Sequence, residues 1–369
     1  MGSIRETYEL IGSSEIKYPI IHNNICQSEK FNPLQIILPA AKRIIVIGDL
    51  HGDLKITLKC LKIANIINDS CDWIAEPNTV VVQIGDQIDS CRPINGEKNC
   101  NDILIDNDSG DDILILNLFT LLKNQAKQKD PNSDVISLLG NHELMNIVEN
   151  LDYVSYENLQ KFKKHDNDDI NTLIYRRQKF FKKGTSQSPP GKGAKFLACT
   201  RQTSVIIGSN LFVHADIISG LPQLLETSNY NKNIIFIKLN DIIQRWILGQ
   251  TTDSEKFKLQ QLLNTNKKGI SPFWGRYLGT LDPELSINDV KCNDVNESLF
   301  NFDIKNIIIG HTPQDDIGIN LTCGHIWRVD VGMSQAFDIF DGQKNKNIGR
   351  KAQVLEIIDD KKFRIIREI

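Results

Sequence analysis

The sequence contains no apolar run long enough to cross a membrane. Its apolar stretches, such as residues 44–48 and 80–82, fall far short of the roughly 20 residues that a membrane-spanning helix needs. The first six residues also lack the apolar core of a secretory signal peptide. We therefore expect a soluble, cytoplasmic protein without a membrane partner.

No two of the eight cysteines form a Cys-x-x-Cys pair. Without such a pair or a secretory signal, scattered cysteines predict free thiols in a reducing compartment and no disulfide framework. Cys91 and Cys100 are close enough in the sequence to close a short loop, and we keep that pairing as an alternative.

The chain also lacks an excess of basic residues. It has 43 Lys and Arg against 46 Asp and Glu, a formal net charge of −3. Nucleic-acid-binding domains usually carry a strongly basic surface, so we expect no nucleic-acid partner. The composition gives no indication of the oligomeric state.

Short β-branched runs alternate with helical patterns in the first part of the chain. Residues 43–47, 79–84 and 135–139 are predicted strands, and residues 54–67 and 113–126 are predicted helices. This order indicates parallel β-α-β units and therefore an α/β fold. Later predicted strands indicate a second sheet packed on the first; they are residues 204–207, 210–214, 306–309, 326–331, 353–358 and 363–366.

We predict a single domain over residues 41–369, preceded by an irregular leader over residues 1–40. Residues 94–112 are rich in Asp and Asn but do not follow the order of a calcium-binding loop, so we interpret them as a solvated acidic loop. Residues 150–195 are predicted to form a polar, partly helical insertion.

Five short motifs place polar side chains directly after predicted strands. They are Gly48-Asp49-Leu50-His51-Gly52, Gly85-Asp86-Gln87-Ile88-Asp89, Gly140-Asn141-His142-Glu143, Val213-His214-Ala215 and Gly310-His311-Thr312. Open α/β sheets bind ligands at the carboxyl ends of their strands. Asp, Asn and His donors suit divalent metal ions, and the absence of Cys from the set argues against a structural zinc site.

A site for two divalent ions needs one bridging carboxylate and separate ligands for each ion. We assign Asp86 as the bridge. The other assigned ligands are Asp49 and His51 for one ion, and Asn141, His214 and His311 for the second. Two such ions lower the pKa of a bridging water, so we expect a metal-bridging hydroxide to attack a phosphorus atom. His142 is assigned as the proton donor to the leaving oxygen, with Asp89 orienting it.

The motifs, in this order, resemble the hallmark blocks of the phosphoprotein phosphatase family of calcineurin-like metallophosphoesterases. Those blocks are Gly-Asp-x-His-Gly, Gly-Asp-x-x-Asp-Arg-Gly, Gly-Asn-His-Glu and a later His-Gly-Gly. Residues 140–146, 211–214, 272–276, 309–313 and 329–334 are similar to further segments of the bacterial-type, Shewanella-like branch. The resemblance covers about residues 43–335.

This resemblance implies a β-sandwich of two mixed sheets flanked by helices. It also implies metal-dependent removal of phosphate from Ser, Thr or Tyr side chains of phosphorylated protein substrates. Arg276 matches the family's phosphate-binding arginine, and a guanidinium group suits phosphate oxygens. Manganese is our first choice of metal, with iron, zinc and magnesium left open.

The sequence departs from the family pattern at two places. After Asp89 the family has Arg and Gly, whereas this chain has Ser90, Cys91 and then Arg92. We predict that Arg92 binds phosphate if the loop bulges; otherwise one of the two phosphate-binding arginines is missing. After His214 the chain has Ala215 and Asp216 where Gly-Gly is common, and Asp216 would bring negative charge near the metals.

Two alternatives stay open at this stage. One is a phosphohydrolase acting on a dinucleoside polyphosphate or another nucleotide, because a fold does not fix a substrate. The other is a metal-binding pseudophosphatase with weak activity, suggested by Ser90 and Asp216. The choice between Ser/Thr and Tyr substrates depends on the depth of the pocket, which the sequence does not give.

Overall fold

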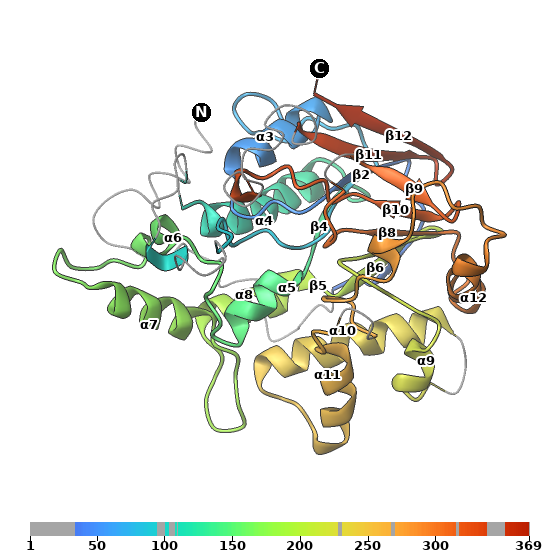
Figure 1. The fold of residues 1–369 in the computed structure, drawn as a ribbon. Helices are drawn as coiled ribbons and strands as arrows, with labels where there is room; N and C mark the ends of the chain where they lie inside the picture. Colours follow the sequence, from blue (N-terminus) through green and yellow to red (C-terminus); the bar gives the residue numbers. More distant parts are fainter. Residues whose placement is uncertain are drawn as a thin grey trace.

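The computed structural model describes residues 34–93, 100–102, 108, 110–227, 231–266, 270–314, 317–337 and 351–368. Two six-stranded mixed sheets form the centre of the molecule, and helices flank them (Figure 1). Side chains of both sheets, among them Val46, Val82 and Phe212, share one buried hydrophobic cluster. The fold is therefore the β-sandwich flanked by helices that the resemblance implies.

The first sheet has the order β12-β11-β2-β3-β4-β5, with β2 to β5 parallel. Its strands are β2 (Arg43–Ile47), β3 (Thr79–Gln83), β4 (Asp134–Leu138), β5 (Arg201–Gln202), β11 (Gln353–Ile358) and β12 (Lys362–Arg367). Crossover helices α3 (Leu54–Ile63) and α4 (Asp112–Lys129) connect β2 to β3 and β3 to β4. Asp53 caps α3 because its side chain accepts the backbone N–H of Ile56.

The second sheet has the order β1-β6-β7-β8-β10-β9. Its strands are β1 (Ile37–Leu38), β6 (Ser204–Ile207), β7 (Asn210–Val213), β8 (Asn306–Ile309), β9 (Asn320–Thr322) and β10 (Ile326–Arg328). Within it, β7 and β8 are parallel neighbours, so their carboxyl ends lie side by side. That arrangement places the loops that follow β7 and β8 next to each other.

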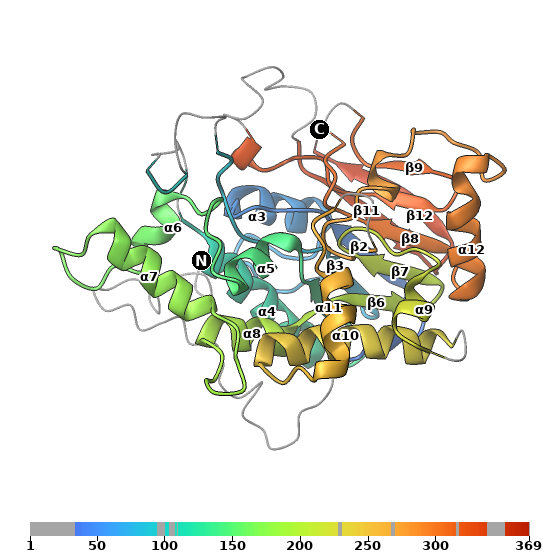
Figure 2. The ribbon, with the colours of Figure 1, turned by 60° about the horizontal axis from the view of Figure 1, so that its bottom comes forward.

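The remaining helices lie around the sandwich. They are α5 (Asn141–Ile147), α6 (Tyr156–Gln160), α7 (Ile170–Phe181), α8 (Lys192–Thr200), α9 (Leu221–Leu224), α10 (Lys232–Leu248), α11 (Lys256–Leu262) and α12 (Asn293–Asn301). Single 3-10 turns are η1 (Cys100–Asp102), η2 (Asp253–Glu255), η3 (Leu278–Thr280), η4 (Val290–Cys292) and η5 (Gln335–Phe337). In both views, α6 and α7 lie on the side opposite α12 (Figure 1, Figure 2).

Two sequence predictions about the fold are corrected. The two last strands, predicted in the second sheet, instead extend the first sheet, because β11 pairs antiparallel with β2. The helix predicted over residues 54–67 ends at Ile63, since Asn65 adopts a left-handed conformation with φ of 51° and the chain turns there.

The prediction of free thiols without disulfides is wrong for the four cysteines of two bonded pairs, and the alternative pairing of Cys91 with Cys100 is present. Cys91 is bonded to Cys100, and Cys292 is bonded to Cys323, whereas Cys60 and Cys71 are free. The fold brings each bonded pair to a Cα–Cα distance of 5.8 or 5.7 Å, which spacing along the sequence does not reveal. The cysteines therefore give no support to a cytoplasmic location.

Within the described part of the chain, no helix is both long and apolar enough to span a bilayer. Most of the predicted leader and most of the acidic loop lie outside the described residues. The predicted insertion over residues 150–195 contains α6, α7 and the start of α8.

Candidate active site

The predicted ligand and proton-transfer residues lie together at the carboxyl ends of five strands. In the first sheet, Asp49 and His51 follow β2, Asp86 and Asp89 follow β3, and Asn141 and His142 follow β4. In the second sheet, His214 follows β7 and His311 follows β8. Because these strands are parallel neighbours within each sheet, their ends meet at one edge of the sandwich.

Gly85 allows the two sheet ends to approach closely. A Cβ atom there would lie 2.7 Å from the backbone nitrogen of Gly140 and 2.9 Å from Nδ1 of His214. The residue also has a φ of +104°, which side-chain-bearing residues rarely adopt. A side chain at Gly85 would therefore collide with the backbone at Gly140 and with the ring of His214.

The first group of candidate metal ligands lies around Oδ2 of Asp86. Nε2 of His51 lies 3.9 Å from Oδ2 of Asp86 and 4.0 Å from Oδ2 of Asp49. Nε2 of His142 also lies 3.9 Å from Oδ2 of Asp86. All of these side chains are buried.

The second group meets the same oxygen from the other side. Nε2 of His214 lies 3.4 Å from Oδ2 of Asp86 and 3.0 Å from Oδ1 of Asn141. Nε2 of His311 is buried and has no hydrogen-bond partner among the described residues. Asp86 and these two histidines are close enough together to hold one ion.

Two backbone carbonyls fix the orientation of the imidazole rings. The Nδ1–H of His51 donates to the carbonyl of Ile88 at 3.3 Å, and that of His214 donates to the carbonyl of Ile84 at 3.0 Å. Each ring therefore turns its Nε2 lone pair toward Asp86, the arrangement that metal-ligating histidines commonly show. Nε2 of His311 has no hydrogen-bond partner among the described residues. Together, these ring nitrogens and the carboxylate of Asp86 form a set of lone-pair ligands that fits two divalent ions sharing Asp86.

Burial and the charges of neighbouring groups together set the charge states in this cluster. Burial lowers the pKa of His51 and of His311 well below the ordinary histidine value, which favours neutral, ligating imidazoles. Burial has the same effect on His214, but the neighbouring Asp86 carboxylate outweighs it and raises the pKa of that ring. Burial and the nearby charges of Asp330 and Asp86 raise the pKa of Asp49 well above its usual range. A bound cation would relieve this repulsion between carboxylates.

Several site residues adopt strained backbone conformations. The φ angles of His51, Asp86, Asp89 and His311 are 44°, 52°, 73° and 64°, in the left-handed region that residues other than glycine seldom occupy. Such conformations cost on the order of 1–3 kcal/mol each and cluster at functional sites. The surrounding hydrogen bonds must therefore hold these loops in place.

Glu143 supplies several of those hydrogen bonds. Its Oε2 accepts the backbone N–H groups of Asp86 at 3.0 Å and Gly140 at 2.7 Å, and its Oε1 accepts that of Gln87 at 2.8 Å. The side chain thus joins the loop after β3 to the start of α5. The sequence motif contained Glu143, but gave it no role.

The Asp89 carboxylate holds the ring of His142 on the side opposite Asp86. Its Nδ1–H donates to Oδ2 of Asp89 at 2.9 Å, and Nδ2 of Asn146 donates to both oxygens of Asp89 at 2.9 and 3.1 Å. Asn146 belongs to residues 140–146, which resemble a segment of the Shewanella-like branch. The resemblance therefore includes Asn146, but the sequence alone did not show that it binds Asp89.

Two further charged groups lie behind Asp89. Nη2 of Arg177, on α7, donates to Oδ2 of Asp112 at 2.7 Å and lies 3.4 Å from Oδ1 of Asp89. The side chain of Arg177 is fully buried. Oδ1 of Asp112 accepts the backbone N–H of Asp89 at 3.1 Å. The sequence analysis assigned Arg177 no role, and it placed Asp112 in the predicted solvated acidic loop, whereas Asp112 is fully buried because it pairs with Arg177.

Arg276 approaches the cluster from the second sheet. Its Nη1 donates to the carbonyl of His311 at 3.1 Å. Asp216 does not face the cluster; its carboxylate accepts the backbone N–H groups of Tyr277 at 2.6 Å and Leu278 at 3.0 Å. The expectation that Asp216 places repulsive charge near the metals is therefore replaced by a contact that holds the segment of Arg276.

A cleft of about 700 Å³ opens over the cluster. Arg276 and Arg92 line it together with His51 and Asp86. Its walls include the aromatic rings of Tyr153, Trp274 and Phe337. Asp330, from a late segment that the resemblance included but to which it gave no role, also lines the cleft.

Residues 42–315 match the family model described as "Calcineurin-like phosphoesterase". The chain is 37% identical over 262 residues to "Uncharacterized protein R398" of Acanthamoeba polyphaga mimivirus, an alignment that covers 67% of this chain and 97% of the viral protein. It is 26% identical over 363 residues to "Shewanella-like protein phosphatase 2" of Arabidopsis thaliana, covering 90% of this chain and 79% of the plant protein.

Solved structures with the same fold include a cold-active protein-tyrosine phosphatase of a psychrophilic Shewanella species. The TM-score is 0.58 at 19% sequence identity, with 92% of this chain and 85% of the other covered. A protein serine/threonine phosphatase from Saccharomyces cerevisiae aligns with a TM-score of 0.54 at 13% identity, over 99% of this chain and 94% of the yeast chain. At these identities the structures establish the fold alone.

Proposed function

The chain belongs to the calcineurin-like phosphoesterase family, and we propose that it is a metal-dependent phosphoprotein phosphatase. Its substrates would be phosphomonoesters of Ser, Thr or Tyr side chains in proteins. The Shewanella-like protein phosphatases among its relatives support a hydrolase that acts on phosphoesters.

One observation carries the proposal: a single carboxylate oxygen stands between two groups of donors. Oδ2 of Asp86 lies 3.9 Å from Nε2 of His51 on one side and 3.4 Å from Nε2 of His214 on the other. A shared carboxylate is what a two-ion hydrolytic site requires. We propose manganese as the metal.

The residues divide into two ligand sets that share Asp86. Asp49 and His51 would complete the first, and Asn141, His214 and His311 would complete the second. When bound, the two ions would supply a water of lowered pKa as nucleophile and neutralise charge on the phosphoryl oxygens.

Side chains of the protein would donate the proton and bind the phosphate. His142 donates a proton to the leaving oxygen, and Asp89 keeps its ring in position through Nδ1. Arg276 and Arg92 bind the phosphoryl oxygens from the cleft, because guanidinium groups present several N–H donors to phosphate.

The nucleotide alternative keeps one supporting observation, the aromatic rings of Tyr153, Trp274 and Phe337 in the cleft wall, on which a base could stack. The pseudophosphatase alternative was suggested by Ser90 and Asp216, neither of which is among the residues that line the cleft. Ser90 hydrogen-bonds Ser155 instead of facing the cleft, and Asp216 binds backbone N–H groups.

The test is phosphate release by the Mn²⁺-loaded full chain from phosphoserine, phosphothreonine and phosphotyrosine peptides, beside diadenosine tetraphosphate. We expect turnover of a phosphopeptide and its loss in Asp86→Asn. Turnover of the nucleotide alone would replace the proposal with the nucleotide alternative. No turnover on any substrate, with metal bound, would favour the pseudophosphatase.

A further inference from the structure

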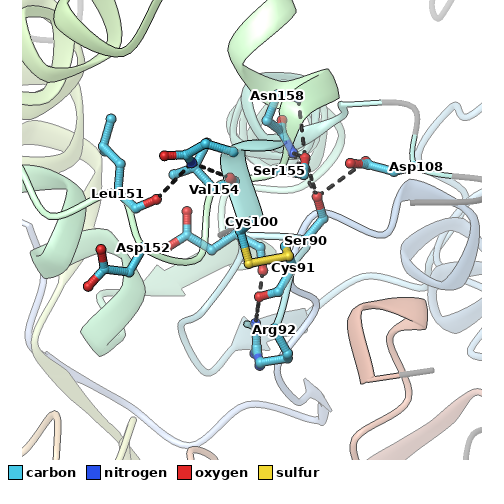
Figure 3. Close-up of a disulfide and its surroundings, with 12 residues drawn as sticks. Ser90, Cys91, Arg92, Cys100, Asp108, Leu151, Asp152, Val154, Ser155 and Asn158 are labelled. Atoms are coloured by element: carbon cyan, nitrogen blue, oxygen red, sulfur yellow. Dashed lines mark hydrogen bonds between the residues drawn. A yellow bond between two sulfur atoms is a disulfide. The ribbon is translucent and has the colours of Figure 1, made fainter. Parts of the chain in front are cut away.

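The loop after β3 carries its arginine two places later than the family block does. Ser90 occupies the position next to Asp89, but its hydroxyl group lies 2.9 Å from Oγ of Ser155 and accepts Nδ2 of Asn158 at 2.8 Å. Ser90 is buried in these contacts (Figure 3). The position that would hold the family's arginine therefore faces α6, and Arg92 is the residue of this loop that brings a guanidinium group to the cleft.

Cys91 lies between these two residues and is fixed at three points. Its N–H donates to the carbonyl of Tyr153 at 3.2 Å, and its carbonyl accepts Nη1 of Arg92 at 2.7 Å. Its sulfur is bonded to Cys100, as Figure 3 shows. The disulfide therefore acts on the same residue whose carbonyl orients the arginine.

The other half of the disulfide is anchored as well. Cys100 is 1% exposed. The next residue, Asn101, donates from Nδ2 to the carbonyl of Leu151 at 3.2 Å and to that of Val154 at 2.8 Å. The bond thus connects the loop of Arg92 to the segment that also carries Tyr153.

Arg92 itself lies close to two aromatic rings. The centre of its guanidinium group lies 4.5 Å from the ring centroid of Phe337 and 5.6 Å from that of Tyr153. Both hydrogen bonds that it donates to described residues come from Nη1, one to Cys91 and one to the carbonyl of Asp89 at 3.2 Å. Nη2 donates no hydrogen bond to a described residue, which leaves it available to a ligand in the cleft that Arg92 lines.

We propose that the Cys91–Cys100 disulfide is a positioning element that makes Arg92 a phosphate-binding residue. It compensates for the displaced arginine by holding the bulge that brings Arg92 into the cleft. A covalent link between residues nine positions apart removes much of the conformational freedom of that loop. The inference rests on the proposed function to the extent that it takes phosphate as the ligand of the cleft.

A double-mutant cycle tests this coupling. The affinity of the Mn²⁺-loaded full chain for inorganic phosphate is measured by calorimetry, without reductant, for the wild type, Arg92→Ala, Cys91→Ser/Cys100→Ser and the triple variant. We expect Arg92→Ala and the cysteine double variant each to weaken binding about tenfold or more, as for loss of a charge-assisted hydrogen bond. The triple variant should bind no more weakly than Arg92→Ala alone.

The second disulfide is a matched control. Cys292→Ser/Cys323→Ser removes the same kind of bond elsewhere in the chain and should leave phosphate affinity within about twofold of wild type. If the Cys91 double variant does not fold, Asn101→Ala keeps the bond but removes its anchor. That variant should weaken phosphate binding less, and its effect should disappear in the Arg92→Ala background.

The outcomes separate this inference from the proposed function. Unchanged phosphate affinity in the cysteine variant, or fully additive losses in the triple variant, would overturn the inference, as would a wild type that binds no phosphate. A wild type that fails to hydrolyse phosphopeptides but shows the expected cycle would overturn the proposed function and leave the inference standing.

Discussion

Nδ1 of His142 lies 2.9 Å from Oδ2 of Asp89, and both side chains are almost completely buried. The ring cannot turn without breaking this bond, so its Nε2 is kept on the side of Asp86, from which it lies 3.9 Å. A side chain held in this way is positioned before any substrate arrives, as the proton transfer proposed for His142 requires.

Asp89→Asn should therefore impair the chemical step. An amide holds the imidazole in place less well and stabilises its cationic form less than a carboxylate does. We expect kcat for a phosphopeptide to fall about 100-fold, with KM changed by less than about threefold. Initial-rate kinetics test this, with the bound Mn²⁺ content measured as a control. A higher KM at an unchanged kcat would show that Asp89 acts in binding instead.

Arg177→Met should destabilise the fold. At pH 8, where Asp112 is ionised, the substitution leaves Asp89 and Asp112 buried without their shared cation, and breaking a buried ion pair costs about 3–5 kcal/mol. Urea unfolding gives the loss directly. In an Asp112→Asn background the same substitution should cost less, because one of the two carboxylates is gone. Equal losses in both backgrounds would show that Arg177 stabilises the fold by packing.

The pH dependence of the free energy of unfolding should show the raised pKa of Asp112. Burial, only partly offset by Arg177, raises the pKa of Asp112 from its ordinary 3.8 to about 7. The folded state thus binds the proton more tightly than the unfolded chain does. Asp112 therefore favours folding below about pH 4, and this contribution is lost as the pH rises to about 7.

The comparison that isolates this group is wild type against Asp112→Asn. The free energy of unfolding of the wild type, minus that of the variant, should fall by at most about 4 kcal/mol between pH 4 and pH 8. Urea titrations at each pH measure it. Parallel curves for the two proteins would show that Asp112 titrates near its ordinary pKa.

Asp216→Ala should weaken substrate binding. The carboxylate holds the backbone N–H groups of Tyr277 and Leu278, next to Arg276 in the chain. Without it we expect KM for a phosphopeptide to rise about tenfold, and Asp216→Asn, which keeps one acceptor oxygen, to have a smaller effect. A lower KM in either variant would instead mean that Asp216 repels the phosphate.

The sequence was sufficient to predict that the candidate site residues lie close together. Asp49, Asp86, Asn141, His214 and His311 each follow a short apolar strand, and parallel strands align their carboxyl ends. The motifs are local, so pattern and spacing suffice to locate them. The two mixed sheets were predicted from the resemblance, not from the periodicity of the strands.

Contacts between distant segments could not be predicted. Arg177 lies on α7, with no motif around it, and reaches Asp89 because α7 packs beside α5. The pairing of Cys292 with Cys323 likewise depends on the approach of η4 to the turn between β9 and β10. The place of β11 beside β2 is a matter of sheet order, which the pattern of a single strand does not encode.

The central claim is that two ions sharing Asp86 are needed for phosphoester hydrolysis. Its most direct test is phosphate release from a phosphopeptide while Mn²⁺ is added stepwise to the metal-free chain. We predict that full activity requires two equivalents of bound Mn²⁺, and that Asp86→Asn stays inactive at every Mn²⁺ concentration. Full activity with one equivalent, or any metal-dependent turnover in Asp86→Asn, would contradict the two-ion site.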